Sequence, residues 1–193
     1  MSLDVFITLT LLFALATIGV WVGVYQNRQH LAILNAQAEK RGGEVVRNNI
    51  FSRAELHLPF KGITIKVFAL PGNRYSPPRM LATVRSDSAL FPAINVLRNT
   101  PMQKLLGSFG RERILTGDEE FDKRCVVRAD DSYTVQRLLT PTVRLCFLDP
   151  FLRSLELKAS PQSIQIQIYS YSKDDEAYDH FIEAALTILQ GIL

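Results

Sequence analysis

Residues 154–169, SLELKASPQSIQIQIY, decide the fold class of this 193-residue chain. From 164 to 168 isoleucine and glutamine alternate, which is the period-two pattern of a strand with one buried face. The turn-forming residues 160–162 separate this strand from a second alternating segment at 154–158. The stretch therefore predicts an antiparallel hairpin that places its isoleucines in a hydrophobic core.

The residues after the hairpin predict a helix that packs on the sheet. Residues 172–175, Ser-Lys-Asp-Asp, resemble a capping box, in which side chains satisfy the first free amides of a helix. Apolar residues then recur at helical spacing, namely Tyr178, Phe181, Ile182, Ala185, Ile188, Leu189 and Ile192. We expect one shared core, formed by Phe121, Ile164, Ile166, Ile168, Phe181 and Ile182. The intervening Gln165 and Gln167 should tolerate substitution.

Segments before the hairpin carry weaker signals of the same kind. Alternating or β-branched residues predict strands at 55–58, 63–67, 80–84, 91–97 and 125–128. Phe60-Lys61-Gly62 predicts a hairpin turn between the first two. Helices are predicted at 131–139 and after Thr100-Pro101 and Thr140-Pro141, because threonine caps a helix and proline suits its first position. The predicted fold class is α+β, with mostly antiparallel strands and a C-terminal packing helix.

An apolar stretch precedes this domain. Residues 5–25 contain no ionisable group except Tyr25, and 21 helical residues give about 32 Å, close to the roughly 30 Å core of a bilayer. The start lacks the basic region and cleavage site of a secretory signal. The sequence thus predicts a single-pass transmembrane helix, with an uncleaved anchor at 1–27, a helical stalk with a Gly-Gly break at 28–43, and a domain at 44–193.

Residues at and beyond the anchor predict its packing and orientation. Small residues on one face of the predicted span could let two helices approach closely, namely Ala16, Gly19 and Gly23. Basic residues occur only after the span, at Arg28, Lys40, Arg41 and Arg47. The positive-inside rule then predicts an outside N-terminus and a C-terminal domain in the cytoplasm, where Cys125 and Cys146 would be free thiols.

Candidate catalytic and metal groups are few. The carboxylates of Asp118, Glu119, Glu120 and Asp122 suit a hard cation, but they lack the spacing of a calcium loop, so a solvated turn is favoured. The three histidines are scattered, and no sequence pattern places one beside a cysteine as a catalytic base. Phosphate-loop, dinucleotide and zinc-protease motifs are absent. We therefore assign no catalytic residue, no cofactor and no metal.

Charge is unevenly distributed along the chain. Residues 61–113 carry nine basic and two acidic side chains, whereas residues 114–193 carry eight basic and thirteen acidic ones. The two halves either neutralise each other on the folded surface or leave a basic face for anionic lipid headgroups. In the second case the contacts are predicted at Arg74, Tyr75, Arg79, Arg111 and Arg113. Nucleic acid is a less favoured partner, because the net charge is only +3.

A resemblance is carried by residues 116–122, TGDEEFD, by 126–131, VVRADD, and by 138–141, LLTP. This pattern resembles an uncharacterised family of bacterial membrane-anchored proteins with a domain of unknown function, and it covers residues 115–193. The resemblance implies the bacterial inner membrane and an anchored cytosolic domain, without an assigned activity. Cys125 departs from the pattern, which has an aromatic residue there.

Two functions from different classes follow as hypotheses. The first is a non-enzymatic binding or scaffold domain that contacts the bilayer through 5–25 and works with a protein partner. The alternative is a membrane-associated, hydrolase-like enzyme with an unrecognised site. A concave pocket with converging polar groups favours the enzyme, and a flat or polarised face favours the scaffold.

Overall fold

The structure is a computed structural model that describes residues 3–47, 52–87, 91–100, 112–169 and 174–193. Its centre is an eight-stranded antiparallel sheet with the strand order β1-β2-β3-β4-β8-β7-β5-β6. The strands are β1 (Glu44–Val46), β2 (Glu55–Phe60), β3 (Ile63–Leu70), β4 (Arg79–Arg85), β5 (Ile94–Arg98), β6 (Cys125–Ala129), β7 (Glu156–Ser160) and β8 (Ser163–Ile168). The helices are α1 (Leu3–Arg41), α3 (Glu119–Arg124), α4 (Ser132–Leu138), α5 (Pro141–Leu148), the 3-10 helix η1 (Pro150–Leu152) and α6 (Asp175–Ile192).

The predicted hairpin at the C-terminal end is present as β7 and β8. Leu157 lies opposite Ile166 in this hairpin, and Ile166 in turn lies opposite Ala82 of β4. The hairpin is therefore inserted between the N-terminal strands and β5, which pairs with β7 on the far side. The sheet becomes continuous only through these two strands.

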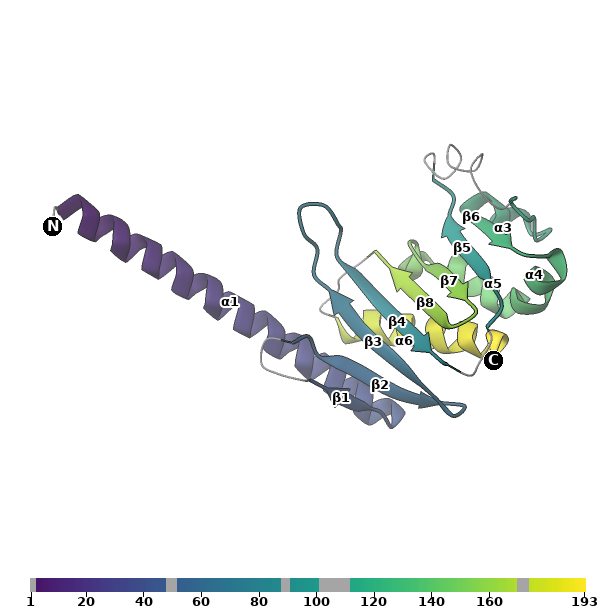
Figure 1. Ribbon diagram of the computed structural model, residues 1–193, viewed down its shortest axis with the longest axis horizontal. Coiled ribbons are helices and arrows are strands. Elements are labelled where there is room, and N and C mark those ends of the chain that lie inside the picture. The colour runs from purple at the N-terminus through teal and green to yellow at the C-terminus, as the bar shows by residue number, and fades with distance from the viewer. Residues whose placement is uncertain (1–2, 48–51, 88–90, 101–111, 170–173) are drawn as a thin grey trace.

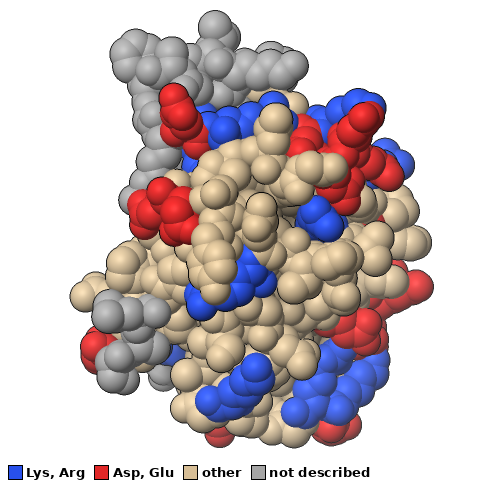
Figure 2. All heavy atoms as spheres, turned by 90° about the vertical axis from the view of Figure 1, so that its right-hand side faces the viewer, with Lys and Arg blue, Asp and Glu red and all other residues tan. Residues whose placement is uncertain are grey.

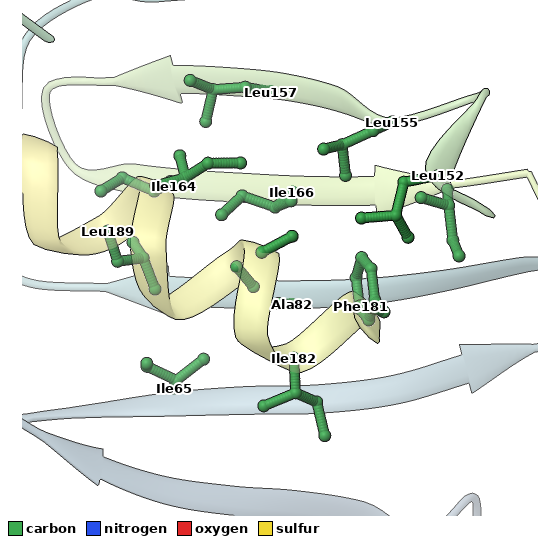
Figure 3. Packing of buried hydrophobic residues seen from close by; sticks show 14 of the residues in the cluster. Ile65, Ala82, Leu152, Leu155, Leu157, Ile164, Ile166, Phe181, Ile182 and Leu189 are labelled. Atoms are coloured by element: carbon green, nitrogen blue, oxygen red, sulfur yellow. The ribbon is translucent and has the colours of Figure 1, made fainter. Parts of the chain in front are cut away.

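Helix α6 covers one face of the sheet, as its apolar stripe predicts. Phe181, Ile182 and Leu189 of α6 lie over the sheet, in the same cluster as Ile65 of β3, Ala82 of β4 and the isoleucines of β8 (Figure 3). The six residues predicted to share a core all belong to one buried cluster. Each of these six side chains is at most 3% exposed. That prediction is confirmed.

The prediction for Gln167 is wrong, because this side chain is only 1% exposed. Its amide nitrogen donates to a carboxylate oxygen of Glu156 at 2.8 Å and to the hydroxyl of Tyr169 at 3.0 Å. Burial and the neighbouring Glu156 carboxylate raise the pKa of Tyr169. On the sheet face turned away from α6, cross-strand hydrogen bonding has replaced the solvent contact that strict alternation predicts.

Helix α1 is continuous from Leu3 to Arg41, and its first half extends away from the sheet with large apolar side chains such as Trp21 exposed (Figure 1). Across the described residues no helix is both long and apolar enough to cross a membrane.

On this finding, the predicted single-pass anchor at 1–27 is wrong. The predicted fold class is therefore wrong in its transmembrane helix, whereas its antiparallel sheet and C-terminal packing helix are present. The inner-membrane localisation with an outside N-terminus is contradicted with it. The packing prediction for Ala16, Gly19 and Gly23 concerns side chains that lie outside the described part of α1.

The second half of α1 packs on the domain instead of leading up to it. Leu34, Gln37 and Ala38 are buried, and Leu34 and Ala38 belong to the core cluster. At the end of the helix Lys40 contacts α6 through ion pairs with Asp175 at 2.7 Å and Asp179 at 2.8 Å. Residues 28–41, assigned from sequence to a stalk, are thus an integral layer over β1, β2 and α6.

Short helices lie on either side of β6 in the chain, with α3 before it and α4, α5 and η1 between it and β7. Aspartate or threonine side chains accept the first free amides of α3, α4 and α5, namely Asp118, Asp131 and Thr140. The helix at 119–124 replaces the solvated turn that we expected there. The helix predicted after Thr100-Pro101 lies outside the described residues, which break off between 100 and 112.

Candidate anion-binding site at one end of the sheet

Antiparallel pairing brings five chain segments to the same end of the sheet. The β3–β4 connection, 71–78, lies next to the end of β8, since Met80 pairs with Ile168. The end of β8 lies beside the start of β7, where Gln167 pairs with Glu156. The end of β5 and the start of β6 complete the row, because β5 is antiparallel to both β7 and β6. We call this edge of the molecule the basic end.

A pocket of about 390 Å³ opens at the basic end, between β5, α3 and η1. Four basic residues line it, and they are Arg98, Lys123, Arg124 and Arg153. The other lining residues are Asn99, Cys125, Phe147, Pro150 and Leu155. Of these, Cys125, Phe147 and Leu155 are buried core residues, so the pocket has basic walls and an apolar floor.

Backbone contacts fix the walls of this pocket. The amide of Asn99 donates to the carbonyl of Arg124 at 2.8 Å, and the side-chain amide of Asn99 donates to the carbonyl of Lys123 at 3.0 Å. The Arg124 guanidinium donates to the carbonyl of Leu148 at the end of α5, at 2.8 Å. Residue 99, helix α3 and helix α5 are therefore joined around the opening.

The basic side chains of the pocket differ in their electrostatic partners. Lys123 forms an ion pair with Glu119 at 3.3 Å, and Arg124 forms one with Glu120 at 3.0 Å, each across one turn of α3. Within the described part of the chain, Arg98 and Arg153 form no ion pair with any residue. The lining includes no carboxylate. The pocket thus retains positive charge that no described carboxylate neutralises.

The Cys125 thiol on the floor does not provide a nucleophile. Burial raises its pKa to about 12, and the nearby carboxylate of Asp122 adds to this, although Arg124 and Arg113 act in the opposite direction. The thiol is therefore protonated at neutral pH and behaves as a small apolar group. Cys125 and Cys146 are both free, as predicted.

The described residues that we predicted as surface contacts do not line the pocket. Arg74 and Tyr75 occupy the β3–β4 connection, where Tyr75 is 90% exposed, and Arg79 begins β4. Arg113 donates through its guanidinium to the carbonyls of Asp122 and Cys125, at the start of β6. Arg111 lies outside the described residues. Four strand spacings of about 4.8 Å, roughly 19 Å, separate β4 from β6 in the sheet order.

Sequence reasoning missed most of the pocket. Arg98 belongs to the basic segment, but Lys123, Arg124 and Arg153 come from the half of the chain with an acidic balance. Residues 98 and 153 meet only because β5 pairs with β7. The charge balance of sequence segments therefore could not predict this basic cluster, because pairing between strands distant in sequence brings its residues together.

The acidic segment after residue 116 is engaged in local structure. The Asp122 carboxylate accepts hydrogen bonds from the amide and hydroxyl of Thr116 at 3.1 and 3.0 Å and from the amide of Gly117 at 3.2 Å. Asp118 accepts from the amide of Phe121 as the cap of α3. Among the described residues no group of three or more potential ligands could hold a metal ion.

The histidines occupy structural positions on the domain. Buried His30 contacts the hydroxyl of Tyr178 through Nδ1 at 3.0 Å, and burial lowers the pKa of this imidazole. His57 lies 3.4 Å from Glu55 on β2. His180 stacks on Phe151, with ring centroids 4.9 Å apart. His30 therefore lies in the interface between α1 and α6.

Basic and acidic side chains alternate on the face near α3, α4 and α5 (Figure 2). Ion pairs across this region include Arg144 of α5 with Asp118 at 3.6 Å. By contrast, the described basic residues of the segment 61–113 form no ion pair with any described carboxylate. The acidic residues of 114–193 therefore do not neutralise the described basic residues of 61–113 through ion pairs.

Comparison with known proteins identifies a similar fold but no family. No protein-family model matches the chain, and no curated protein matches it. A solved structure, that of the mycobacterial trehalose monomycolate transport factor A, TtfA, superposes with a TM-score of 0.54 at 7% sequence identity. The match covers 86% of this chain and 96% of that protein. The two chains therefore share a fold over most of their length.

Proposed function

We propose that this chain is a non-enzymatic binding domain that contacts anionic lipid headgroups through the basic end of its sheet. The observation that carries the proposal is a row of arginines there without ion-pair partners in the described structure, namely Arg74, Arg79, Arg98, Arg113 and Arg153. The fold shared with a transport factor is compatible with a binding role.

Charge and an exposed aromatic side chain support this assignment. A basic side chain near an anionic leaflet contributes about 1 kcal/mol, so five such residues contribute about 5 kcal/mol, a factor of several thousand in affinity. Tyr75 at the tip of the β3–β4 connection is 90% exposed, and amphipathic rings favour the headgroup level. Exposure of these groups at one edge favours a surface contact.

The alternative of a hydrolase-like enzyme is weaker at this site. A concave pocket is present, as an enzyme would require, but its lining has no carboxylate or imidazole that could act as a general base. The only lining thiol, that of Cys125, is held protonated by burial. Basic walls over an apolar floor suit retention of an anionic ligand better than proton transfer.

Co-sedimentation of the full chain with vesicles tests the proposal. We expect binding to phosphatidylglycerol vesicles in excess of binding to phosphatidylcholine vesicles, and we expect high salt to abolish this excess. The double variant Arg74→Glu/Arg79→Glu should lose most of it. Lys61→Glu/Arg85→Glu makes the same charge change at the opposite end of these strands and serves as the matched control. Equal losses in both variants would contradict a directional contact.

A further inference from the structure

We propose that the pocket at the basic end holds one phosphate monoester carried on a short apolar chain. This deepens the proposed function and rests on it, because it names the class of anionic group that the pocket within the basic end selects. The pocket differs from the exposed arginines of the β3–β4 connection in having walls fixed by hydrogen bonds and a buried floor.

The charge inside the pocket selects the ligand class. Glu119 and Glu120 neutralise Lys123 and Arg124, which leaves the guanidinium groups of Arg98 and Arg153 without counter-charge among the described residues. A phosphate monoester carries a charge of about −1.5 to −2 at neutral pH, whereas a diester carries about −1. Two unneutralised arginines therefore match a monoester. Each guanidinium can also donate two hydrogen bonds to phosphate oxygens.

The floor of the pocket selects an apolar substituent on the phosphate. Cys125, Phe147 and Leu155 are each 3–4% exposed and present carbon and sulfur atoms to the cavity. A volume of about 390 Å³ is near the lower end of ligand sites, which span roughly 300–1,000 Å³. This volume suits a phosphate with several methylene groups. Each buried methylene should raise affinity about fourfold.

Hydrogen bonds within the protein hold the walls of the pocket in place. Asn99 joins the end of β5 to the two carbonyls that close α3, and Arg124 joins α3 to the end of α5. Arg98 therefore stands on a strand end that is tied to the opposite wall. A site arranged in this way loses little conformational entropy when it closes around a ligand.

Isothermal titration of the full chain with hexyl phosphate tests the proposal. We expect one molecule bound per chain at pH 7.5, with inorganic phosphate and the diester methyl hexyl phosphate each at least tenfold weaker. Binding of hexyl phosphate should weaken several-fold as the pH falls below about 6, where the monoester takes up its second proton. A diester that binds as tightly as the monoester would overturn the proposal.

Variants locate the binding. Arg98→Gln and Arg153→Gln should each weaken hexyl phosphate at least tenfold, while Arg85→Gln at the opposite sheet end should leave affinity unchanged. Both pocket arginines are exposed at the surface, so we expect each variant to fold. Circular dichroism checks this. Unchanged affinity in folded Arg98→Gln and Arg153→Gln would place the phosphate elsewhere and refute the site.

The two proposals fail separately. Loss of the vesicle excess with retained hexyl phosphate binding would refute the surface contact and leave the pocket intact. Vesicle binding that depends on Arg74 and Arg79, without saturable hexyl phosphate binding, would refute the pocket alone.

Discussion

Individual carboxylates and amides in this protein join elements that are distant in sequence. Asp179 on α6 accepts hydrogen bonds from Lys40 and Arg41 on α1, both at 2.8 Å. Burial acts to raise the pKa of Asp179, but these hydrogen bonds outweigh it and lower the pKa to about 2. On the other face of the sheet Gln167 holds the buried Glu156. The contribution of each of these two contacts to the free energy of unfolding can be measured with single substitutions.

Acid should loosen the contact between α1 and α6. Because the pKa of Asp179 is lower in the folded state than its ordinary value of 3.8, its stabilising contribution is complete above about pH 4 and is lost as the pH falls toward 2. Urea titrations followed by circular dichroism should show Asp179→Asn less stable than the parent at pH 5, with most of the difference gone at pH 2. A constant difference would contradict this assignment.

Removal of the Gln167 amide should destabilise the sheet. Gln167→Ala leaves the Glu156 carboxylate, which is 9% exposed, without its closest hydrogen-bond donor, and such a loss costs about 1–3 kcal/mol. Gln165→Ala is the matched control, because Gln165 is only half-buried. Equal free energies of unfolding for the two variants in denaturant titrations would show that the Glu156 contact contributes nothing.

At the scale of elements, local patterns identified the hairpin and α6 but not the role of α1. Alternation in β8 and the apolar stripe of α6 are properties of short segments, so sequence predicted them. The three-residue strand β1 carries too few residues for a pattern, and its place is set by pairing with β2. Sequence predicted a separate stalk for the second half of α1, because the burial of residues such as Leu34 depends on contacts with the sheet that no local pattern reveals.

Truncation should distinguish the two halves of α1. A chain that begins at Gln26 keeps Leu34, Ala38 and the Lys40 ion pairs, so it should unfold at nearly the same temperature as the full chain. A chain that begins at Glu44 uncovers the core that α1 shares with β2, and it should lose cooperative unfolding. Thermal scans by circular dichroism check both. A stable fold in the shorter chain would show that α1 is dispensable.

At the scale of the molecule, the sheet order was beyond sequence reasoning. Strand β4 pairs with β8, whose residues lie about eighty positions later in the chain. No local pattern in residues 79–85 predicts this pairing. The pocket depends on the same pairings, because Arg98 and Arg153 meet through β5 and β7. Sequence thus predicted element types and core residues, whereas the arrangement that creates the candidate site depends on non-local contacts.

A sheet that is continuous only through one hairpin should unfold as one unit. Ile166→Ala removes a fully buried side chain from β8, at a cost of about 2–5 kcal/mol. Native-state hydrogen exchange should show the same loss of protection in β3, on one side of the hairpin, and in β5, on the other. Loss confined to one side would indicate two independently stable halves.

The insertion of β7 and β8 also constrains synthesis of the chain. A ribosome completes β4 and β5 long before it reaches residues 156–168, so each waits with one unpaired edge exposed to other nascent chains. Only after residues 156–168 have left the exit tunnel can the hairpin close both edges. Folding of the sheet is therefore delayed until β8 emerges, and the demand for chaperone protection should be greatest in the interval between synthesis of β5 and synthesis of β8.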